Sequence, residues 1–409
     1  MNTWQRMICL WDGNAFFAAI AQMDNPTLRG RPIAITNGMK GTAIITCSYE
    51  ARAYGITTGM RLREARKLCP ELIQVPSQPE RYAEVSTAIM DALQVVSPDT
   101  ARFSVDEGFI DLTRVQRLHR MDAYGFGRWI KRVIFDASGL LCSVGISGDK
   151  TTAKYAAKLQ KPDGLTVIEP DVAEARLADV PVTDLCGISD GIGAFLAARG
   201  VHRCGQMKNI PISALAQRFG NPGRRLWLMA QAKDPEPVME DTRPAKTIGH
   251  GKVVPPDTRS RELIETYLMH MAEKVGRRLR RNVLEAQTFS IGLRTDLGTI
   301  GAKARSVTPT DDGAAIYALA RGFLSSRWDG QGVSQVQINA LDPRPRSQQA
   351  DLFAEGAHAN APLNTAIDEI NARFGGFTVH RAPLLARSET PDVIAPSWQP
   401  GGSRDSIGH

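Results

Sequence analysis

The chain is 409 residues long, which is more than a single hydrophobic core usually supports, so several domains are expected. Its composition, 43% hydrophobic and 23% charged, is that of an ordinary globular protein. No uncharged apolar run of about 18 residues predicts a membrane span, and the N-terminal segment lacks the apolar stretch and cleavage site of a signal peptide. These features predict a cytoplasmic protein that does not enter a membrane.

Fifty Lys and Arg against 43 Asp and Glu give a net charge of +7, which is compatible with a polyanionic partner but does not establish one. The excess is concentrated in residues 246–344, where 4 Lys and 11 Arg face 10 acids, a balance of 15 − 10 = +5. A long helix expected there ends in four arginines, which form either a phosphate-binding patch or a solvated helix end. They are Arg277, Arg278, Arg280 and Arg281.

Six cysteines are scattered without a Cys-x-x-Cys pair or a histidine cluster, which argues against a disulfide framework and against a zinc site. We therefore expect reduced, mostly buried thiols. They are Cys9, Cys47, Cys69, Cys142, Cys186 and Cys204.

The first 170 residues alternate strand and helix patterns, which predicts an α+β or α/β domain. Residues 7–11 (MICLW) have the composition of a buried strand, and the apolar segment AFFAAIAQM predicts a helix with Asn14 as its N-cap. Asp12 would then lie at a strand-to-helix junction. Further along, ARFSVDEGFIDLT consists of two strand-like halves around a polar turn, which places Asp106 and Glu107 at the tip of a hairpin.

The rest of the chain divides into a helical region, a linker, a compact domain and a tail. The Pro-rich, charged stretch DPEPVMEDTRPAK, near residues 234–245, predicts a linker after the helical region. Residues 246–344 then show a strand-helix-strand-helix-strand order. The remainder begins with a polar stretch, contains one helical segment, LNTAIDEINARF, and ends in about 20 residues that we expect to be disordered.

Asp12, Asp106 and Glu107 are candidates for a metal centre. Phosphoryl transfer with a nucleotide uses two divalent ions about 3.5 to 4 Å apart, held by a few carboxylates. These acids are expected at strand ends, and hard oxygen ligands suit Mg²⁺. An Asp-Glu dipeptide at a turn is by itself more often ordinary turn chemistry, so the three acids alone leave both interpretations open.

Six ordered motifs are far more specific than any one of them. They are DGNAFFA, TCSYEARAYG, ERYAEVS, SVDEGFIDLT, SVGISGDKTTAKYAAKLQKPDGLTVI and the KTIG strand. In order and spacing they resemble the Y-family translesion DNA polymerases, in particular the bacterial DNA polymerase IV and polymerase V catalytic-subunit type. The resemblance covers roughly residues 7–344, and loosely extends to about residue 388.

The resemblance implies an α+β multidomain protein with the right-hand architecture of a polymerase. The expected parts are a ferredoxin-like palm (1–23 and 77–170), small fingers (24–76), a helical thumb with a helix-hairpin-helix (171–237), a linker (238–245), an α/β little-finger domain that binds DNA (246–344) and a C-terminal tail (345–409).

The same resemblance implies the roles of the acids and of one aromatic residue. Asp12, Asp106 and Glu107 would hold two Mg²⁺ ions, with the Gly13 carbonyl as a backbone ligand. Phe17 matches the steric gate, whose ring would leave a ribose 2′-OH without room or a hydrogen-bond partner. On helical periodicity alone, Phe17 is instead a core residue.

The incoming dNTP would be held by side chains and metal, since the sequence has no glycine-rich phosphate loop. Tyr49 and Arg52 match finger residues that grip the triphosphate, and Thr46 is expected close to them. Arginine suits this role because its planar guanidinium binds phosphate oxygens in a bidentate manner. Lys161, in KPDG, matches the lysine that completes the site. Without the resemblance, Arg52 and Lys161 would be interpreted as solvated charges.

GISDGIGAFL resembles a helix-hairpin-helix, in which backbone amides at a helix N-terminus bind DNA phosphate without recognising sequence. Its candidate residues are Gly187, Ser189 and Gly191. Ser189 stands where the family usually has glycine, and Asp190 follows it, so a purely structural turn is an equal alternative. Arg277, Arg278, Arg280 and Arg281 are the further candidates for DNA contacts.

Residues 349–353, QADLF, look like the short peptide by which bacterial polymerases attach to the sliding clamp. Leu352 and Phe353 would enter an apolar pocket while Gln349 forms hydrogen bonds. The alternative is a Leu-Phe pair that packs in a core. The polar setting beyond the last predicted domain favours the clamp peptide, because a tether must be exposed.

The function predicted is low-fidelity, DNA-directed DNA synthesis for lesion bypass by a monomer, with primer–template DNA, dNTPs and a sliding clamp as partners. One alternative is a catalytically inactive family member that serves as a DNA- and clamp-binding adaptor. The other is a nucleotide cyclase or similar two-metal enzyme, which would need neither the basic block nor the clamp peptide. Asn14, where the family often has Asp, leaves the polymerase IV or polymerase V subgroup open.

Overall fold

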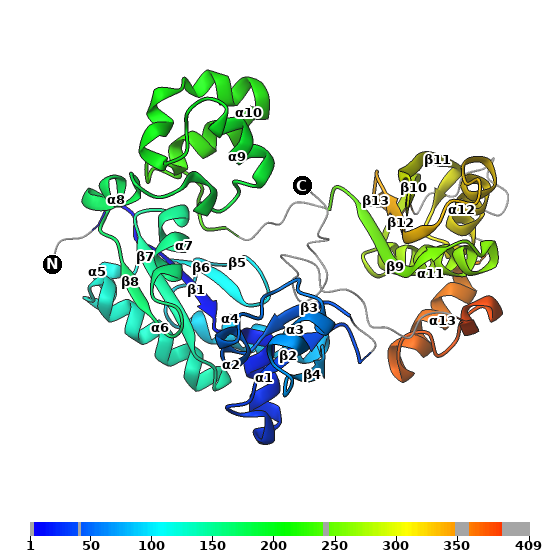
Figure 1. Cartoon of the computed structure of the whole chain (residues 1–409), viewed down its shortest axis with the longest axis horizontal. Coiled ribbons are helices and arrows are strands. Elements are labelled where there is room, and N and C mark those ends of the chain that lie inside the picture. The colour runs from blue at the N-terminus through cyan, green and yellow to red at the C-terminus, as the bar shows by residue number, and fades with distance from the viewer. Residues whose placement is uncertain (1–3, 40–41, 240–244, 348–359, 387–409) are drawn as a thin grey trace. The chain divides into compact units, whose positions relative to one another are not determined.

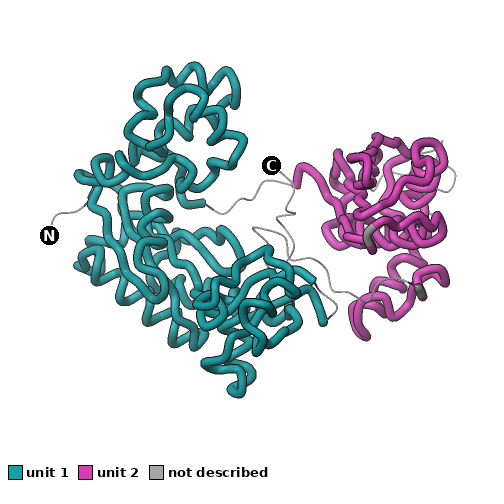
Figure 2. The backbone as a smooth tube through the Cα atoms, viewed as in Figure 1, with its two compact units in different colours: residues 1–242, 396–402 teal, residues 243–395, 403–409 magenta. Residues whose placement is uncertain are grey.

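The computed structural model describes residues 4–39, 42–239, 245–347 and 360–386 (Figure 1). The chain divides between residues 242 and 243 into two compact units (Figure 2). Each unit mixes helices with sheets, as expected of an α+β multidomain protein.

The first unit is centred on a five-stranded sheet with the order β5-β6-β1-β7-β8. The strands are β1 (Ile8–Gly13), β5 (Thr100–Arg102), β6 (Glu107–Asp111), β7 (Cys142–Ser147) and β8 (Leu165–Val167). When β8 is left out and the other four strands are numbered 1 to 4 along the chain, their order across the sheet from β7 to β5 is 4-1-3-2. The central strand β1 is antiparallel to both β6 and β7.

Helices cover both faces of this sheet, which explains why β1 is apolar along its length. On one face, α4 (Pro79–Leu93) packs against α6 (Ala123–Ser138), and Met90 of α4 lies beside Gly108 of β6. On the other face, α7 (Lys150–Leu159) packs on β1 and β7. A Cβ at Gly145 of β7 would lie 2.1 Å from the Ala153 carbonyl oxygen, so α7 rests directly on the strand backbone.

A smaller sheet, β3-β2-β4, forms a separate lobe of the first unit. Its strands are β2 (Ile33–Thr36), β3 (Ile44–Cys47) and β4 (Ile73–Pro76), and its helices are α2 (Tyr49–Ala53) and α3 (Leu62–Leu68). The chain enters it through α1 (Phe16–Asp24) and η1 (Pro26–Leu28). The lobe has its own small core around Ile44, Ile56 and Leu72. Between β6 and α6 lies one further short helix, α5 (Gln116–His119).

The helical region that the sequence predicts after residue 170 is present, with a core of its own. It consists of α8 (Pro170–Leu177), η2 (Val182–Asp184), α9 (Asp190–Ala197), η3 (Cys204–Asn209) and α10 (Ile212–Met229). Helix α10 is interrupted at Gly220, whose φ of 65° and ψ of −143° are not helical.

The composition of residues 234–239 predicts part of a linker, but these residues are packed on the first unit. Asp234 is 1% exposed and accepts hydrogen bonds from Arg225 and Thr151. Val238 joins the apolar cluster that contains Leu10. The bonds of the buried Asp234 carboxylate and one apolar side chain thus hold a segment whose composition is that of a solvated linker. Positions 240–244 of the predicted linker lie outside the described residues.

The second unit is a four-stranded antiparallel sheet with the order β11-β10-β12-β9 and two helices on one face. The strands are β9 (Ile248–Thr258), β10 (Leu284–Thr295), β11 (Gly298–Thr310) and β12 (Val333–Ala340), and the helices are α11 (Arg261–Arg281) and α12 (Gly313–Arg327). The short β13 (Arg344–Pro345) also pairs with β10. The sequence analysis missed β11. The residues of this strand that pack on the core are Ile300, Ala302 and Ala304, and two of these three are too small to give the apolar alternation typical of a strand.

Residues 360–386, expected in a C-terminal tail, pack on the second unit. They form α13 (Ala361–Phe374) and η4 (Ala382–Ala386). Asp368 of α13 forms an ion pair with Arg280 at 2.6 Å, and Leu384 is fully buried. The expected helix is therefore present, but as part of the folded unit rather than of a tail.

The thiol groups agree with the sequence prediction, because all six cysteines are free and five of them are buried. Within the described ranges, no helix combines the length and apolarity that crossing a lipid bilayer requires.

Candidate active site

The pairing of β1 with β6 brings the three candidate acids together. Asp12 lies opposite Glu107 in the antiparallel register. The next residue, Gly13, donates its backbone N–H to the Asp106 carbonyl oxygen at 2.8 Å. Acids that are more than 90 positions apart in sequence therefore meet at one edge of the sheet.

The chain turns sharply after this edge. Ala15 has a φ of 45° and a ψ of 45°, a left-handed conformation that is uncommon outside glycine and leads directly into α1. Asn14 does not cap α1 as the sequence predicts, because the left-handed residue moves the N-cap position to Ala15. Instead, Asn14 is 7% exposed and bonds to Ser143 of β7 and to the backbone of Asp163.

Each acid has a different polar partner. Lys161 places its Nζ 2.6 Å from Oδ1 of Asp12. Lys154 of α7 forms an ion pair with Glu107, and the hydroxyl of Ser104 donates to Oδ1 of Asp106 at 2.5 Å. Two lysine ammonium groups thus balance part of the negative charge at this edge.

The carboxylates lie in an environment that favours a cation. Burial raises the pKa of Asp106, the hydrogen bond from Ser104 opposes that rise, and the charge of Asp12 adds to it. Burial also raises the pKa of Glu107, against the effect of Lys154. Burial acts to lower the pKa of Lys154, but the carboxylate of Glu107 outweighs it and the pKa is raised.

The three acids fit a site for hard divalent ions by donor chemistry and by charge. Buried carboxylates that repel one another are stabilised by a nearby dication. In the part of the chain that the structure describes, however, no three Asp, Glu, His or Cys side chains are arranged so that they could hold a metal ion. The acids are instead turned toward Lys161, Lys154 and Ser104.

Phe17 lies on α1 one turn beyond this edge and is 8% exposed. Its ring stacks on Tyr82 of α4, with 4.1 Å between the ring centroids and 13° between the ring planes. Burial raises the pKa of Tyr82 to about 12. Tyr82 comes from the ERYAEVS motif, and the sequence analysis assigned it no role.

The three candidate finger residues lie together in the small lobe. Thr46 is in β3, while Tyr49 and Arg52 are in α2, which Ser48 caps by accepting from the Ala51 amide. The Arg52 guanidinium lies 4.7 Å from the centroid of the Tyr49 ring. Gln22 of α1 is hydrogen-bonded to Glu50, which ties α2 to the helix that carries Phe17.

Comparison with known proteins identifies the family. Residues 11–158 match the model of the impB/mucB/samB family, and residues 245–352 match the model of that family's C-terminal domain. The chain is 36% identical over 386 residues to a DNA polymerase IV of Moorella thermoacetica, covering 92% of this chain and 96% of the relative. It is 32% identical to a DNA polymerase IV of Pelotomaculum thermopropionicum, at 92% and 95% coverage. A DNA polymerase IV of Caulobacter vibrioides is 30% identical, at 90% and 91% coverage.

The chain belongs to the Y family of DNA-directed DNA polymerases. The three relatives named above are DNA polymerase IV proteins, which favours that subgroup over the polymerase V type.

In this Y-family polymerase, the candidate helix-hairpin-helix is an exposed turn. Gly187 has a φ of 90°, and Ser189 is the N-cap of α9, where its side chain makes no capping bond. Gly191 and Asp190 in the first turn of α9 are also exposed. The first arm of the motif is the 3₁₀ turn η2 rather than an α-helix.

The four candidate arginines of α11 lie in the helical layer of the second unit, behind its sheet. Arg278 donates to the Gly249 carbonyl oxygen at 2.6 Å. Arg280 is bonded to Asp368 and to the Asp311 carbonyl oxygen. These intramolecular bonds argue against phosphate contacts by Arg278 and Arg280. Arg277 is half-buried, and Arg281 at the helix end is exposed.

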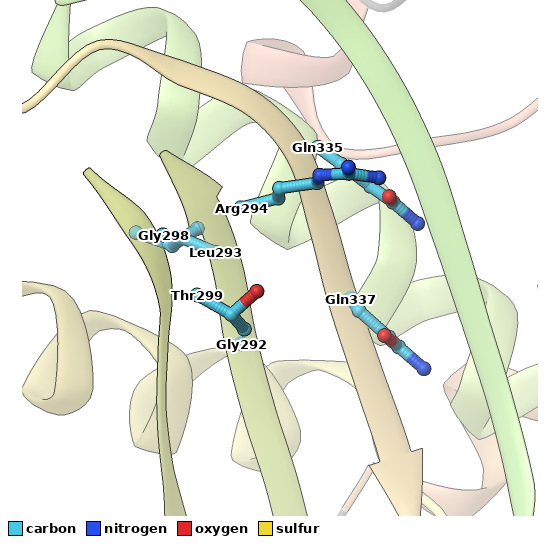
Figure 3. Close-up of a pocket in the computed structure, with 7 residues that line it drawn as sticks. All are labelled: Gly292, Leu293, Arg294, Gly298, Thr299, Gln335 and Gln337. Carbon is cyan, nitrogen blue, oxygen red and sulfur yellow. The ribbon is translucent and has the colours of Figure 1, made fainter. Parts of the chain in front are cut away.

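The sequence analysis missed a polar surface on the other face of this sheet. Three glycines and one glutamine form a row across it, with Gly292 opposite Gly301 and Gln337, and with Gln337 opposite Gly251. Gly292 and Gln337 line a depression of about 370 Å³, together with Arg294, Thr299 and Gln335 (Figure 3). The signal was present in the alternation of small or polar residues with buried Phe289, Ile291 and Leu293 in β10.

The predicted clamp peptide, with Gln349, Leu352 and Phe353, lies outside the described residues.

Proposed function

We propose that this Y-family polymerase carries out low-fidelity translesion DNA synthesis by two-metal nucleotidyl transfer from a dNTP to a primer 3′-OH. The observation that carries the proposal is the β1–β6 register, which sets Asp12 opposite Glu107 and beside Asp106. Asp12, Asp106 and Glu107, with the Gly13 carbonyl, would hold two Mg²⁺ ions. When bound, these ions would supply activation of the 3′-OH and neutralisation of the leaving pyrophosphate.

We assign the parts of the hand as follows. The five-stranded sheet is the palm, in residues 1–23 and 77–170. Four of its strands have the 4-1-3-2 order of a ferredoxin-like fold. The small β3-β2-β4 lobe is the fingers (24–76), and the helical region is the thumb (171–237). The second unit is the little-finger domain, to which residues 360–386 add a helical layer.

Lys161, Arg52 and Tyr49 bind the triphosphate in this proposal. The side chain of Lys161 is 30% exposed and its ammonium lies against Asp12, from where it would turn toward phosphate oxygens. Lys154 is only 13% exposed and stays with Glu107, whose carboxylate it holds in place. Positive groups beside the triphosphate favour the negative charge that develops on the leaving group.

Sugar selection is assigned to Phe17. Its ring is backed by Tyr82 in a parallel stack and therefore cannot retreat from a 2′-OH without disturbing α4. Accuracy on the template would be low, because a small finger lobe encloses the nascent pair loosely and gives up geometric discrimination.

The open face of the second unit's sheet is the proposed DNA-binding surface. In its row of Gly251, Gln337, Gly292 and Gly301, only Gln337 has a side chain that could keep a phosphate backbone away from the peptide groups. Arg294, Lys303 and Arg305 are exposed nearby and supply positive charge. Contacts of this kind hold DNA without recognising its sequence. Binding to the sliding clamp through Gln349, Leu352 and Phe353, a monomeric state and a cytoplasmic location remain predictions from the sequence.

Primer extension tests the proposal. Purified protein with Mg²⁺, dNTPs and a primer–template should extend the primer across an undamaged and an abasic template, and Asp106→Asn should reduce the rate at least about a thousandfold. The matched control is Asp111→Asn, at the other end of β6, which should retain activity. A wild-type protein that binds DNA but does not extend the primer would instead support the adaptor function.

A further inference from the structure

Asn14 joins three parts of the palm in a buried position. It follows β1, and its Nδ2 donates to Oγ of Ser143 in β7 at 2.9 Å. Its Oδ1 accepts the backbone N–H of Asp163 at 2.8 Å. Its own backbone N–H is bonded to the Leu141 carbonyl oxygen at 3.0 Å. With 7% of its surface exposed, Asn14 has nearly all of its polar capacity used inside the protein.

The bond to Asp163 matters because that residue belongs to the loop that carries Lys161. Asp163 has a φ of 57°, a conformation that a non-glycine residue holds only when its surroundings enforce it. Lys131 of α6 holds the same residue from the other side, with its Nζ 2.6 Å from the Asp163 carboxylate and 3.2 Å from the Cys142 carbonyl oxygen. The loop is thus fixed at Asp163, two residues after Lys161.

The contacts between β1 and this loop form two parallel bridges. One runs from Asp12 to Lys161 and the other, two residues further along both segments, runs from Asn14 to Asp163. The first bridge joins two charged groups that both have to act on the nucleotide, whereas the second joins two groups with no part in the chemistry. We propose that Asn14 is a positioning residue that sets where Lys161 stands relative to Asp12 and therefore to the triphosphate.

A carboxamide suits this position better than a carboxylate. One side chain donates to Ser143 and accepts from Asp163 at the same time. It also adds no negative charge beside Asp12, Asp106 and Glu107, which already gather negative charge at one edge of the sheet. This inference rests on the proposed function, because the role of Lys161 toward the triphosphate is assigned there.

A double-mutant cycle tests the inference by steady-state primer extension in the full-length protein. Asn14→Ala should raise the KM for dNTP about tenfold and change kcat less than about threefold, because the loop loses its anchor while the acids remain. In a Lys161→Ala background, the same substitution should change KM less than about twofold, since it acts through that lysine. Asn14→Asp keeps an oxygen that accepts the Asp163 N–H, so its KM should lie closer to the wild-type value than to that of Asn14→Ala.

Equal fold-changes of KM in the two backgrounds, or an unchanged KM, would overturn the inference. Asn25→Ala is the matched control and should leave KM unchanged. It also removes an asparagine oxygen that accepts a backbone N–H, in this case that of Thr27. Thermal unfolding monitors folding, and Asn14→Ser replaces Asn14→Ala in the cycle if the latter melts below the assay temperature. Wild-type protein that fails to extend primers refutes the proposed function itself, which is a separate outcome.

Discussion

The two lysines at the acid edge differ in how firmly the fold holds them. Lys154 is 13% exposed, pairs with Glu107 and lies 4.4 Å from the centroid of the Phe103 ring, so both its charge and its stem are fixed. Lys161 is 30% exposed and comes from a loop rather than a helix. The difference fits a division of labour in which Lys154 holds an acid in place and Lys161 moves to a phosphate.

A substitution at Phe17 tests the sugar selection. Phe17→Ala should increase ribonucleotide incorporation relative to dNTP incorporation by at least about tenfold, because the space beside the 2′ carbon is opened. Tyr82→Ala should give a smaller increase, since Phe17 loses only its backing ring. The measurement is kcat/KM for one ribonucleotide and for its deoxy counterpart. Phe135→Ala, which removes an exposed ring on α6, is the control; an unchanged ratio in Phe17→Ala would remove the assignment.

Sequence named the residues of the candidate active site, but it did not predict their environment. The acids, Phe17 and Lys161 stand in motifs and could be named from the chain alone. Lys154 could not, because in KTTAKYAAK it looks like any exposed helical lysine, and only the packing of α7 on the sheet turns it toward Glu107. Asn14 looked like a helix cap, since a left-handed alanine at position 15 has no sequence signal.

Among the elements, α13 shows what local pattern alone does not determine. Its buried residues are Asn364 and Asn371, whereas Leu363 and Phe374 are 55% and 64% exposed. Apolar periodicity correctly predicts that this helix exists. It also predicts that the apolar side faces inward, which is not the case. The orientation is set by polar bonds to α11 and α12 instead, including those of Asp312 with Asn360 and Asn364. Such bonds depend on the tertiary structure, so they produce no periodic pattern in the sequence.

Asp312 should make the attachment of α13 dependent on pH. Burial acts to raise its pKa, but hydrogen bonds from Asn360, from the Ala314 amide and from Asn364 outweigh it, and the pKa is lowered. A carboxyl group whose pKa is lower in the folded state contributes stability above its unfolded pKa of about 3.9 and loses it as the pH falls through the folded pKa. Asp312→Ala should therefore cost ~1–2 kcal/mol at pH 7, and less as the pH approaches 3.

The measurement is urea unfolding of the intact chain, followed by hydrogen exchange in peptides from α12 and α13 at both pH values. Asp329→Ala, which removes an exposed acid from the same unit, is the control. A stability difference between wild type and Asp312→Ala that stays constant down to pH 3 would show that the bonds of the ionised carboxylate do not hold α13.

For the molecule as a whole, two of the four candidate arginines of the second unit make bonds inside the protein. The arginine-rich end of α11 holds the unit together through Arg278 and Arg280. The surface that we propose for DNA is the open face of the sheet, where small and polar residues from four strands lie side by side. The strand order that creates this face depends on β11, which the sequence analysis missed, so the surface could not be predicted either.

Salt dependence of DNA binding tests this surface. Lys303→Ala and Arg294→Ala should each weaken binding to a primer–template and reduce the slope of log K against log salt concentration by about 1, because each removes a phosphate contact. Arg321→Ala, which removes an exposed arginine on α12 in the helical layer, should change neither. If Arg321→Ala lowered the slope and the two sheet variants did not, DNA would be bound on the helical side.

The most direct test of the account is the number of divalent ions bound when Mn²⁺ replaces Mg²⁺ in a complex with primer–template and a non-hydrolysable dNTP analogue. Electron paramagnetic resonance should count two protein-dependent Mn²⁺ ions in the wild type, after subtraction of the nucleotide alone, and at least one fewer in Asp12→Asn. The Asp111→Asn control should match the wild type. The same count in Asp12→Asn and wild type would contradict a metal site built from the edge where β1 meets β6.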